Sequence, residues 1–400
     1  MFFGNRKSKA KWQKPFIDNV FRHKTKHCNS FSKIVLSHIE LLDGKTDYTP
    51  QSLFKFYKPT AENILDIRKR RLWFSHPKTF NDPFDCHTGY DSESYEKHAF
   101  MEYVKKNGQA NSENSKNSFT LDEYNRLVAS TTEHDYYNYN KYERYDTVLR
   151  KILEDKSESF NRQIYDVKMR EREEVEDKMT LLRNAKIRIA CFSALDRNKG
   201  FNDIIQMWSH YTDNHQGFCV EYDTSNICSS INLVNKDHDF YSDRSAYMDE
   251  RVRAALYAGL FPVIYQASRV NIPKTKLKRI KIDSKGHLQH DSEVDAILYK
   301  TYIVKSAKWS YEKEWRIILD EDVCDYFDNK VPFPYINRIF LGCKMNKQNI
   351  DAMIEIAAEI GAEIVMMSMD NKKFTIEEHS ICSYEWERKR SKWNNPFSQM

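Results

Sequence analysis

The sequence predicts an α+β fold in which a mixed β-sheet forms the core and a long helical segment is inserted into it. Short apolar or alternating stretches, which are typical of strands, occur before residue 91 and again after residue 186. Between them the apolar spacing becomes helical and charged residues are frequent. Glycine is scarce, with 10 in 400 residues, and no glycine-rich phosphate loop is present. We therefore do not expect a Rossmann or P-loop fold, and any nucleotide must be held by other means.

Bulk composition places the chain among intracellular globular proteins. Its 400 residues are 40% hydrophobic, which is enough for one large domain or two ordinary ones, and the net charge of +5 requires no nucleic-acid partner. The eight cysteines form no CxxC motif, so we expect free thiols and no metal site. No stretch approaches the roughly 18 apolar residues of a membrane span, and the N-terminus lacks the apolar core of a signal peptide. A cytoplasmic location without membrane contact is predicted.

The first 50 residues are predicted to form a basic arm followed by a packing helix. Between Met1 and His27 there are eight Lys or Arg and one Asp, with aromatic residues interleaved. This arm is interpreted either as a nucleic-acid contact or as a solvated tail, and the tail is favoured. The stretch "FSKIVLSHIELL" then has helical apolar spacing.

Residues 51–400 are predicted to form a single α+β domain, with the helical insertion at about 91–186. Before the insertion we expect a strand at "LFKF", a helix from Thr60 as its N-cap, a strand at "RLWFS" and a turn at "NDP". Within the insertion, "SYEKHAFMEYVKK", "LDEYNRLVAS" and a long pattern over 145–184 read as helices. Their charges are interpreted as a solvated face, or alternatively as a contact between copies or with a partner.

After the insertion the pattern predicts the rest of the sheet. Strands are expected at "KIRIACFSALD", "GFCVEYD", "FPVIYQ", "NRIFLG", "AEIVMMSM" and "KFTIEEHSI". Helices are expected at "IIQMWSHYT" and at "NKQNIDAMIEIAAEIG", where Gly361 ends the helix. The basic stretch over 269–285 is interpreted as a phosphate contact or as a solvated loop or guarded edge strand.

The stretch "KWSYEKEWRIIL" at 308–319 suggests a candidate site. In an extended strand, alternate side chains share a face, so Glu312, Glu314 and Arg316 are expected on one face and Trp309 and Trp315 on the other. The polar face is either a solvated Arg–Glu pair or one wall of an active site.

Two histidines in the stretch "MWSHYTDNHQG" suggest a second candidate site. His210 and His215 could ligate a metal or act as an acid or base, but hydrogen bonding that holds the turn before Gly217 is favoured. Trp208 and Tyr211 are interpreted as core or as cleft lining.

Several phrases resemble one prokaryotic family, domain of unknown function family twenty-nine seventy-one. They are "LFKF…LWFSHPKTFNDPFDC", "CFSALD", "MWSHYTDNHQGFCVEYD", "YKTYIVKSAKWSYEKEWRIIL" and "IFLGCKM", in that order. A weaker resemblance links the three core strands to ADP-ribosyltransferases, in which a basic residue, a Ser and a Glu converge on NAD. Carried over, this resemblance assigns Lys55 to the basic position, Ser193 to the second and Glu314 to the third, with Glu312 as a preceding carboxylate.

The resemblance implies a reaction with NAD as substrate. Glu314 would stabilise the oxocarbenium-like centre as nicotinamide leaves, Glu312 would act on the acceptor, and Ser193 would hydrogen-bond the ribose. Residues expected to contact NAD are Lys55, Tyr57, Ser75, Asn81, Asp82, Trp208, His210, Tyr211 and Arg316.

The expected function is therefore an NAD-dependent ADP-ribosyltransferase-like effector or NAD glycohydrolase, in bacterial phage defence or a toxin system. Its acceptor would be a protein or a nucleic acid, and the helical insertion would support a homo-oligomer. Two alternatives stay open. One is a metal-dependent nuclease built around His210 and His215 that uses the basic stretches. The other is a non-catalytic sensor or scaffold.

Overall fold

The computed structural model describes residues 49–90, 100–101, 109–110, 116–131, 145–183, 186–195, 200–228, 252–253, 255–281, 289 and 291–380. The chain divides into two compact units. The sheet unit comprises Met1–His87, Ala185–Arg269 and Tyr299–Met400, and the helical unit comprises Thr88–Asn184 and Val270–Leu298. The predicted basic arm and its packing helix lie outside the described residues, apart from the last two of the first 50.

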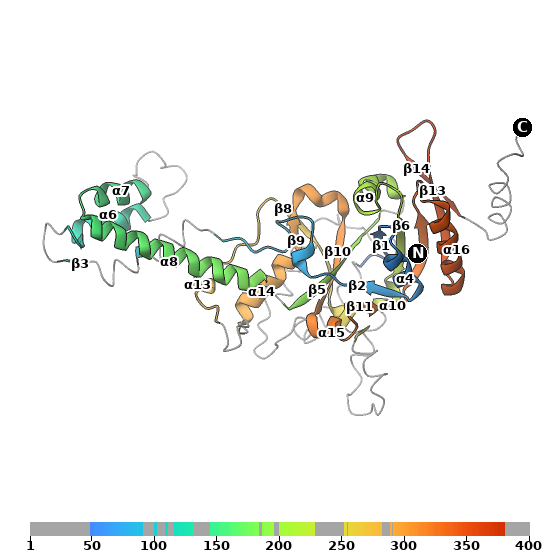
Figure 1. Ribbon diagram of the computed structural model, residues 1–400, viewed down its shortest axis with the longest axis horizontal. Helices are drawn as coiled ribbons and strands as arrows, with labels where there is room; N and C mark the ends of the chain where they lie inside the picture. The colour runs from blue at the N-terminus through green and yellow to red at the C-terminus, as the bar shows by residue number, and fades with distance from the viewer. Residues whose placement is uncertain are drawn as a thin grey trace, which may run out of the picture. The chain divides into compact units, whose positions relative to one another are not determined.

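An eight-stranded mixed sheet organises the sheet unit, in the order β14-β13-β12-β6-β1-β5-β10-β7 (Figure 1). The α+β prediction with a mixed sheet is thus confirmed. The pair β12–β13 is parallel, and every other adjacent pair in this sheet is antiparallel. The strands are β1 (Ser52–Tyr57), β5 (Ile187–Ser193), β6 (Phe218–Asp223), β7 (Leu260–Pro262), β10 (Glu314–Asp320), β12 (Ile336–Leu341), β13 (Glu363–Met369) and β14 (Ile376–Ser380).

Local capping signals set the ends of two helices in this unit. Helix α4 (Ala61–Arg68) begins after Thr60, whose side chain accepts from the Asn63 backbone N–H, as predicted. Helix α16 (Lys347–Ile360) ends at Gly361, whose φ of 72° is the left-handed conformation that glycine tolerates best.

Shorter elements complete the sheet unit. They are β2 (Arg71–Trp73) paired with β11 (Lys330–Pro332), β8 (Ile264–Gln266) paired with β9 (Val304–Ser306), the 3-10 helices η2 (Pro77–Thr79), η4 (Gly200–Ile204) and η6 (Ala307–Glu312), and the helices α9 (Ile205–Tyr211), α10 (Ser225–Cys228) and α15 (Glu321–Asp325).

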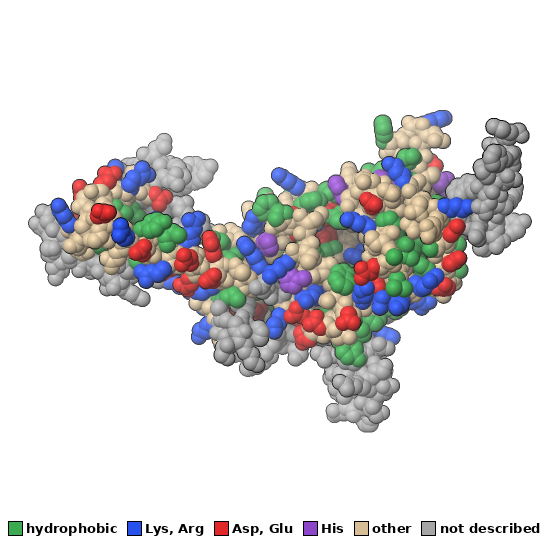
Figure 2. Space-filling model, in the orientation of Figure 1, with side chains coloured by type: hydrophobic (Ala, Val, Ile, Leu, Met, Phe, Trp, Pro, Cys, Tyr) green, Lys and Arg blue, Asp and Glu red, His purple; other side chains and the backbone are tan. Residues whose placement is uncertain are grey.

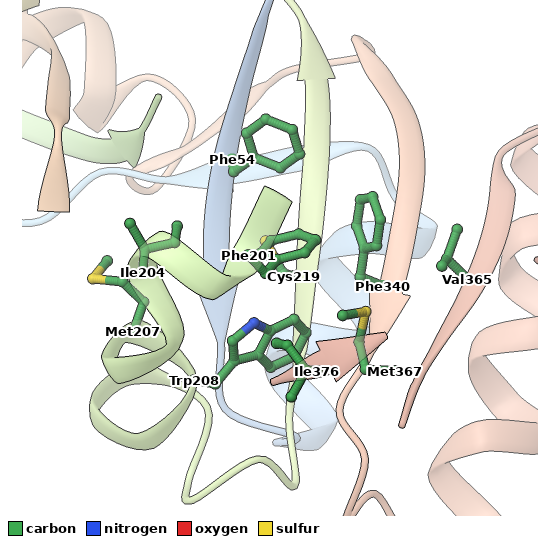
Figure 3. Close-up of a cluster of buried hydrophobic side chains, with 10 residues drawn as sticks. All are labelled: Phe54, Phe201, Ile204, Met207, Trp208, Cys219, Phe340, Val365, Met367 and Ile376. Carbon is green, nitrogen blue, oxygen red and sulfur yellow. The ribbon is translucent and has the colours of Figure 1, made fainter. Parts of the chain in front are cut away.

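One hydrophobic cluster of the sheet unit lies between one face of the sheet and the η4–α9 segment (Figure 3). Trp208 of α9 is fully buried there and meets Phe56 of β1 and Phe201 of η4 edge to face. Aromatic pairs in this geometry add to the free energy gained by burial. The cluster comprises Phe54, Phe201, Ile204, Met207, Trp208, Cys219, Phe340, Val365, Met367 and Ile376.

Strands β1 and β5 pair at only one point. All six residues of β1 are registered with β6, whereas on the other side only Phe54 is registered with a β5 residue, Ser193. Further along β5, Ile189 instead exchanges two backbone hydrogen bonds of 2.9 Å with Ser75. The sheet therefore opens between β1 and β5, and this opening is where the cavity described below lies.

The predicted strand over 308–319 is wrong in its first half. Residues Ala307–Glu312 form η6, and Lys313 has a left-handed φ of 47°. The strand β10 begins only at Glu314, so pleat alternation does not place Glu312. The helical turn and the left-handed residue, rather than a regular strand, bring the two glutamates to the same cavity.

Other boundaries also differ from the prediction. The expected strand "FPVIYQ" is divided at Val263 into β7 and β8, which belong to different sheets. The single long helical pattern over 145–184 is divided into α7 (Tyr145–Glu154) and α8 (Glu158–Arg183). Within the basic stretch 269–285, the short helix α13 (Lys274–Leu277) forms.

The helical unit has its own core, in which α6 (Leu121–Thr131) and α7 pack with the start of α8 through side chains such as Phe119, Leu149 and Phe160. The short strands β3 (Gln109–Ala110) and β4 (Phe119–Thr120) pair beside them, and α14 (Ser292–Tyr302) begins in this unit. Acidic and basic side chains intersperse over the exposed face of α8 (Figure 2). Such a face suits either the predicted solvated surface or the predicted contact with another copy or a partner. Within the described ranges, every helix is too short or too polar to cross a bilayer.

Candidate active site

A cavity of about 420 Å³ opens in the sheet unit where β1 and β5 separate. Its volume is within the range of small-molecule sites. Of the twelve side chains predicted to form the site, eight line this cavity: Lys55, Ser75, Asn81, Ser193, His210, Tyr211, Glu312 and Glu314. The sequence thus assigned to one site residues that are up to 259 positions apart in the chain, and the fold brings them together.

Lys55 reaches across the opening between the two strands. Its ammonium donates a 3.0 Å hydrogen bond to the carbonyl oxygen of Cys191 on β5 and lies 5.7 Å from the ring centres of Tyr57 and Phe192. Burial lowers the pKa of Lys55 from its ordinary value, although the nearby Glu314 carboxylate offsets part of this effect. Lys58, which is exposed, lines the same cavity.

Ser193 occupies the junction of three strands. It is registered with Phe54 of β1 on one side and with Glu314 of β10 on the other. Residues registered across antiparallel strands point to the same face of the sheet. The Ser193 side chain, only 2% exposed, therefore lies beside the Glu314 carboxylate at the cavity wall.

Glu314 is locked into a buried ion pair with Arg316. The guanidinium Nε lies 2.7 Å from Glu314 Oε1, and one terminal nitrogen lies 3.1 Å from Oε2. Arg316 also makes two hydrogen bonds of 2.9 and 2.7 Å to Asp85 and one of 2.7 Å to the Tyr302 carbonyl. Burial by itself would raise the pKa of Glu314, but the charges of Arg316 and Lys305 outweigh it and lower this pKa to about 2.

Lys305 joins the two glutamates of the cavity. Its ammonium lies 2.5 Å from Glu312 Oε2, 3.1 Å from Glu314 Oε2 and 3.6 Å from Asp85 Oδ2. The side chain is nearly fully buried on β9, directly before the η6 turn that carries Glu312. Because both carboxylates raise the pKa of Lys305 against the effect of burial, the ammonium stays charged.

Glu312 has a different environment from Glu314. Its Oε1 accepts a 2.6 Å hydrogen bond from the Tyr211 hydroxyl, and its Oε2 is bound by Lys305. Asn81 contributes a side-chain hydrogen bond to the same tyrosine. Burial, together with the charge of Glu314, raises the pKa of Glu312 from its ordinary value, although Lys305 and Tyr211 act in the opposite direction.

Four of the predicted site residues do not line the cavity. Tyr57 hydrogen-bonds the Tyr222 hydroxyl at 2.6 Å, and the Asp82 carboxylate caps the turn by accepting from the Phe84 N–H at 2.9 Å. Trp208 belongs to the hydrophobic core, and Arg316 is buried behind Glu314. In this structure these four residues support the fold around the cavity, and their contact with a ligand stays a prediction.

The two histidines do not share a site. His210 is exposed and lines the cavity. His215 lies against Trp208 with near-parallel rings and forms a 3.2 Å hydrogen bond with Ser209, so it holds the turn. Throughout the part of the chain that the structure describes, no three or more His, Cys, Asp or Glu side chains are grouped to hold a metal ion.

The sequence interpretation missed Lys305. The only signal for it is a lysine inside the otherwise apolar run "YIVKSA", where a buried charge needs a partner. Asp85, which lies two residues after the predicted turn at "NDP", also lines the cavity and binds Arg316 with both oxygens. The five cysteines with described side chains, Cys191 at the cavity among them, are free thiols.

The lowered pKa of Glu314 predicts a loss of stability in acid. A carboxyl group whose pKa falls from 4.5 to about 2 on folding contributes about 3 kcal/mol, fully present above the unfolded value and lost as pH falls through the folded one. We expect the free energy of unfolding, measured by urea titration, to decrease as the pH is lowered from 4.5 to about 2. Glu314→Gln should flatten this part of the profile, whereas Glu359→Gln, at an exposed ion pair with Arg68, should leave it unchanged. An equal slope in both variants would contradict the assignment.

Comparison with known proteins places part of the chain in context. A family model described as "Protein of unknown function (DUF2971)" matches residues 207–317. The range includes His210, Tyr211, Lys305, Glu312 and Glu314, so the resemblance to that family is confirmed over this part of the chain. The phrases at "LFKF", "CFSALD" and "IFLGCKM" lie outside the matched range. Neither a curated protein nor a solved structure matches the chain.

Proposed function

We propose that the cavity binds NAD and cleaves its nicotinamide–ribose bond, with transfer of ADP-ribose to an acceptor or to water. One observation carries the proposal. An amine, a hydroxyl and two carboxylates, from Lys55, Ser193, Glu312 and Glu314, border one cavity although they come from distant parts of the chain. These are the groups that the resemblance to ADP-ribosyltransferases assigns to this chemistry.

The charges of the cavity suit the proposed reaction. Asp85, Glu312 and Glu314 surround two cations, Lys305 and Arg316, so this cluster carries one net negative charge when all five are ionised. Cleavage of the nicotinamide–ribose bond develops positive charge on the ribose, and a fixed negative charge in a cavity of low dielectric stabilises it.

Two further lysines supply the complementary charge for a dinucleotide. Lys55 and Lys58 line the cavity from β1 and the residue after it, and Lys55 lies close enough to Glu314 to interact with its charge. An ammonium acts on diphosphate oxygens as a point charge. A ligand with anionic phosphates and a ribose that becomes cationic therefore matches both sets of groups.

The biological setting is part of the same proposal. NAD cleavage or ADP-ribosylation in a bacterial cell would act as an effector in phage defence or in a toxin system, with a protein or nucleic acid as acceptor. The helical unit, with its separate core and charged α8 surface, would provide a contact between copies or with that partner.

The direct test is to incubate the full chain with NAD, to measure NAD binding by calorimetry and to follow free nicotinamide by chromatography. We expect binding and a time-dependent release. Lys55→Met should raise KM several-fold because it removes a cavity cation. The matched control Lys69→Met removes an exposed lysine at the end of α4 and should leave KM unchanged.

Two results would contradict the proposal. One is that NAD neither binds to the protein nor releases nicotinamide when incubated with it. The other is cleavage of DNA or RNA that requires added divalent metal while NAD stays intact, which would favour the nuclease alternative.

A further inference from the structure

The two cavity glutamates differ in what holds them. Both oxygens of Glu314 are bound by Arg316, a side chain with no exposed surface, whose contacts with Asp85, Tyr302 and Glu314 use all five of its N–H donors. Both charges of this pair are therefore compensated within the wall, and exchanging a proton at Glu314 would break a buried ion pair.

Glu312 is held by a phenol and an ammonium group instead of a guanidinium. One oxygen accepts from the Tyr211 hydroxyl at 2.6 Å and the other from the Lys305 ammonium at 2.5 Å. Each carboxylate oxygen has two lone pairs, so each keeps one acceptor position beyond these bonds. Glu312 lines the cavity and has no hydrogen bond to Arg316 among the contacts of the described residues.

We propose that Lys305 is a positioning residue that holds Glu312 ionised and oriented, together with Tyr211, so that Glu312 is the carboxylate that takes a proton from the acceptor. The proposal rests on the proposed function, in which the resemblance already assigns Glu312 to the acceptor and Glu314 to the ribose cation. It adds Lys305 as the residue that positions Glu312 for that step. No prediction from the sequence gave Lys305 a role.

The proton step balances within the cavity. The acceptor oxygen forms a bond to the ribose carbon while its O–H proton passes to Glu312. The carbon–nitrogen bond breaks, and its electron pair stays on the nicotinamide nitrogen, which leaves neutral. No metal or redox partner takes part in this step.

The groups that face Glu312 determine when it can accept that proton. Lys305 from β9 and Tyr211 from α9 favour the charged form, whereas Glu314 from β10 and burial favour the protonated form. Tyr265 of β8 and Tyr311 of η6 also feel its charge, and burial raises the pKa of each of these phenols, so both stay neutral. Lys305 is thus the cation that forms an ion pair with Glu312 among the described residues.

The test is a direct titration of Glu312 in the full chain. Glutamate side chains are labelled with carbon-13 at the carboxyl, the Glu312 signal is assigned by its absence in Glu312→Gln, and its shift is followed from acid to alkaline pH. Lys305→Met should move the midpoint upward by about 1–3 pH units, the usual effect of losing an adjacent opposite charge. Lys305→Arg, which keeps the charge, should restore most of the shift.

Two variants keep the test decisive. Tyr211→Phe removes one hydrogen bond to Glu312 without changing charge and should also raise the Glu312 midpoint. This variant tests the proposal even where Lys305→Met fails to fold. Lys308→Met removes an exposed lysine on η6 and is the matched control, with no expected shift. Unchanged midpoints in Lys305→Met and Tyr211→Phe would overturn the proposal.

The titration also separates this inference from the proposed function. Shifted midpoints without nicotinamide release would support the positioning role while removing NAD as the substrate. If the wild-type chain releases nicotinamide but the Glu312 midpoint is the same in Lys305→Met and Tyr211→Phe as in the wild type, NAD remains the substrate and the positioning role is overturned. If NAD is cleaved, the acid limb of the pH profile of the rate should move to higher pH in Lys305→Met, by the same amount as the Glu312 titration midpoint.

Discussion

Glu312→Gln is expected to lower the rate of nicotinamide release by a factor of about 10²–10⁴, the usual contribution of a general base. Glutamine has the same shape, and its amide oxygen still accepts a hydrogen bond from Lys305 or Tyr211, so the cavity should keep its form. What is lost is the negative charge that takes the proton. The measurement is kcat at saturating NAD, with calorimetric NAD binding measured on the same preparation.

The control for this prediction is Glu359→Gln, which removes an exposed carboxylate on α16 that pairs with Arg68. Its kcat should equal that of the wild type. A Glu312→Gln protein that binds NAD and retains its full rate would show that Glu312 transfers no proton.

Arg316→Met is expected to reduce the free energy of unfolding by about 3–5 kcal/mol, the usual cost of removing one partner from a buried ion pair. The guanidinium has no exposed surface and binds Asp85 and Glu314 with two hydrogen bonds each. Without it, the buried carboxylates of Asp85 and Glu314 keep Lys305 as their ion-pair partner among the described residues. Urea unfolding followed by tryptophan fluorescence reports on the sheet unit, since Trp208 and Trp315 are buried there.

Arg68→Met provides the comparison, because its partner Glu359 is about half exposed and such pairs contribute about 1 kcal/mol or less. Adding Asp85→Asn and Glu314→Gln to Arg316→Met should recover part of the lost stability, since no unpaired charge then remains. An Arg316→Met protein as stable as Arg68→Met would contradict the role given to this ion pair.

Local signals in the sequence were sufficient for much of the sheet unit. Thr60 and Gly361 set helix ends through their own backbone preferences and hydrogen bonds, which act over a few residues. Strands such as β5 and β6 are runs of apolar residues that exceed the length of a turn and lack breakers. Eight of twelve predicted site residues line the cavity, where the pairing of distant strands, which periodicity alone does not contain, brings them together.

Local patterns failed where a tertiary contact outweighed them. Alternation in "KWSYEKEW" predicted a strand, and a regular strand would hold Glu312 and Glu314 about 7 Å apart. In the structure, Lys305 instead forms ion pairs with both glutamates across the η6 turn. Ion pairs with Asp85 and Glu314 likewise hold Arg316 behind the cavity wall.

By itself, the sequence determined the fold class, most of the strands and the two glutamates as a candidate pair. Only the tertiary structure decided which glutamate is neutralised and which keeps acceptor positions, because that depends on whether Arg316 or Lys305 lies nearer to each carboxylate. Such distances between side chains follow from strand pairing and from the opening between β1 and β5. The free energy of a buried charge depends on its neighbours in space, and the order of residues along a chain does not specify them.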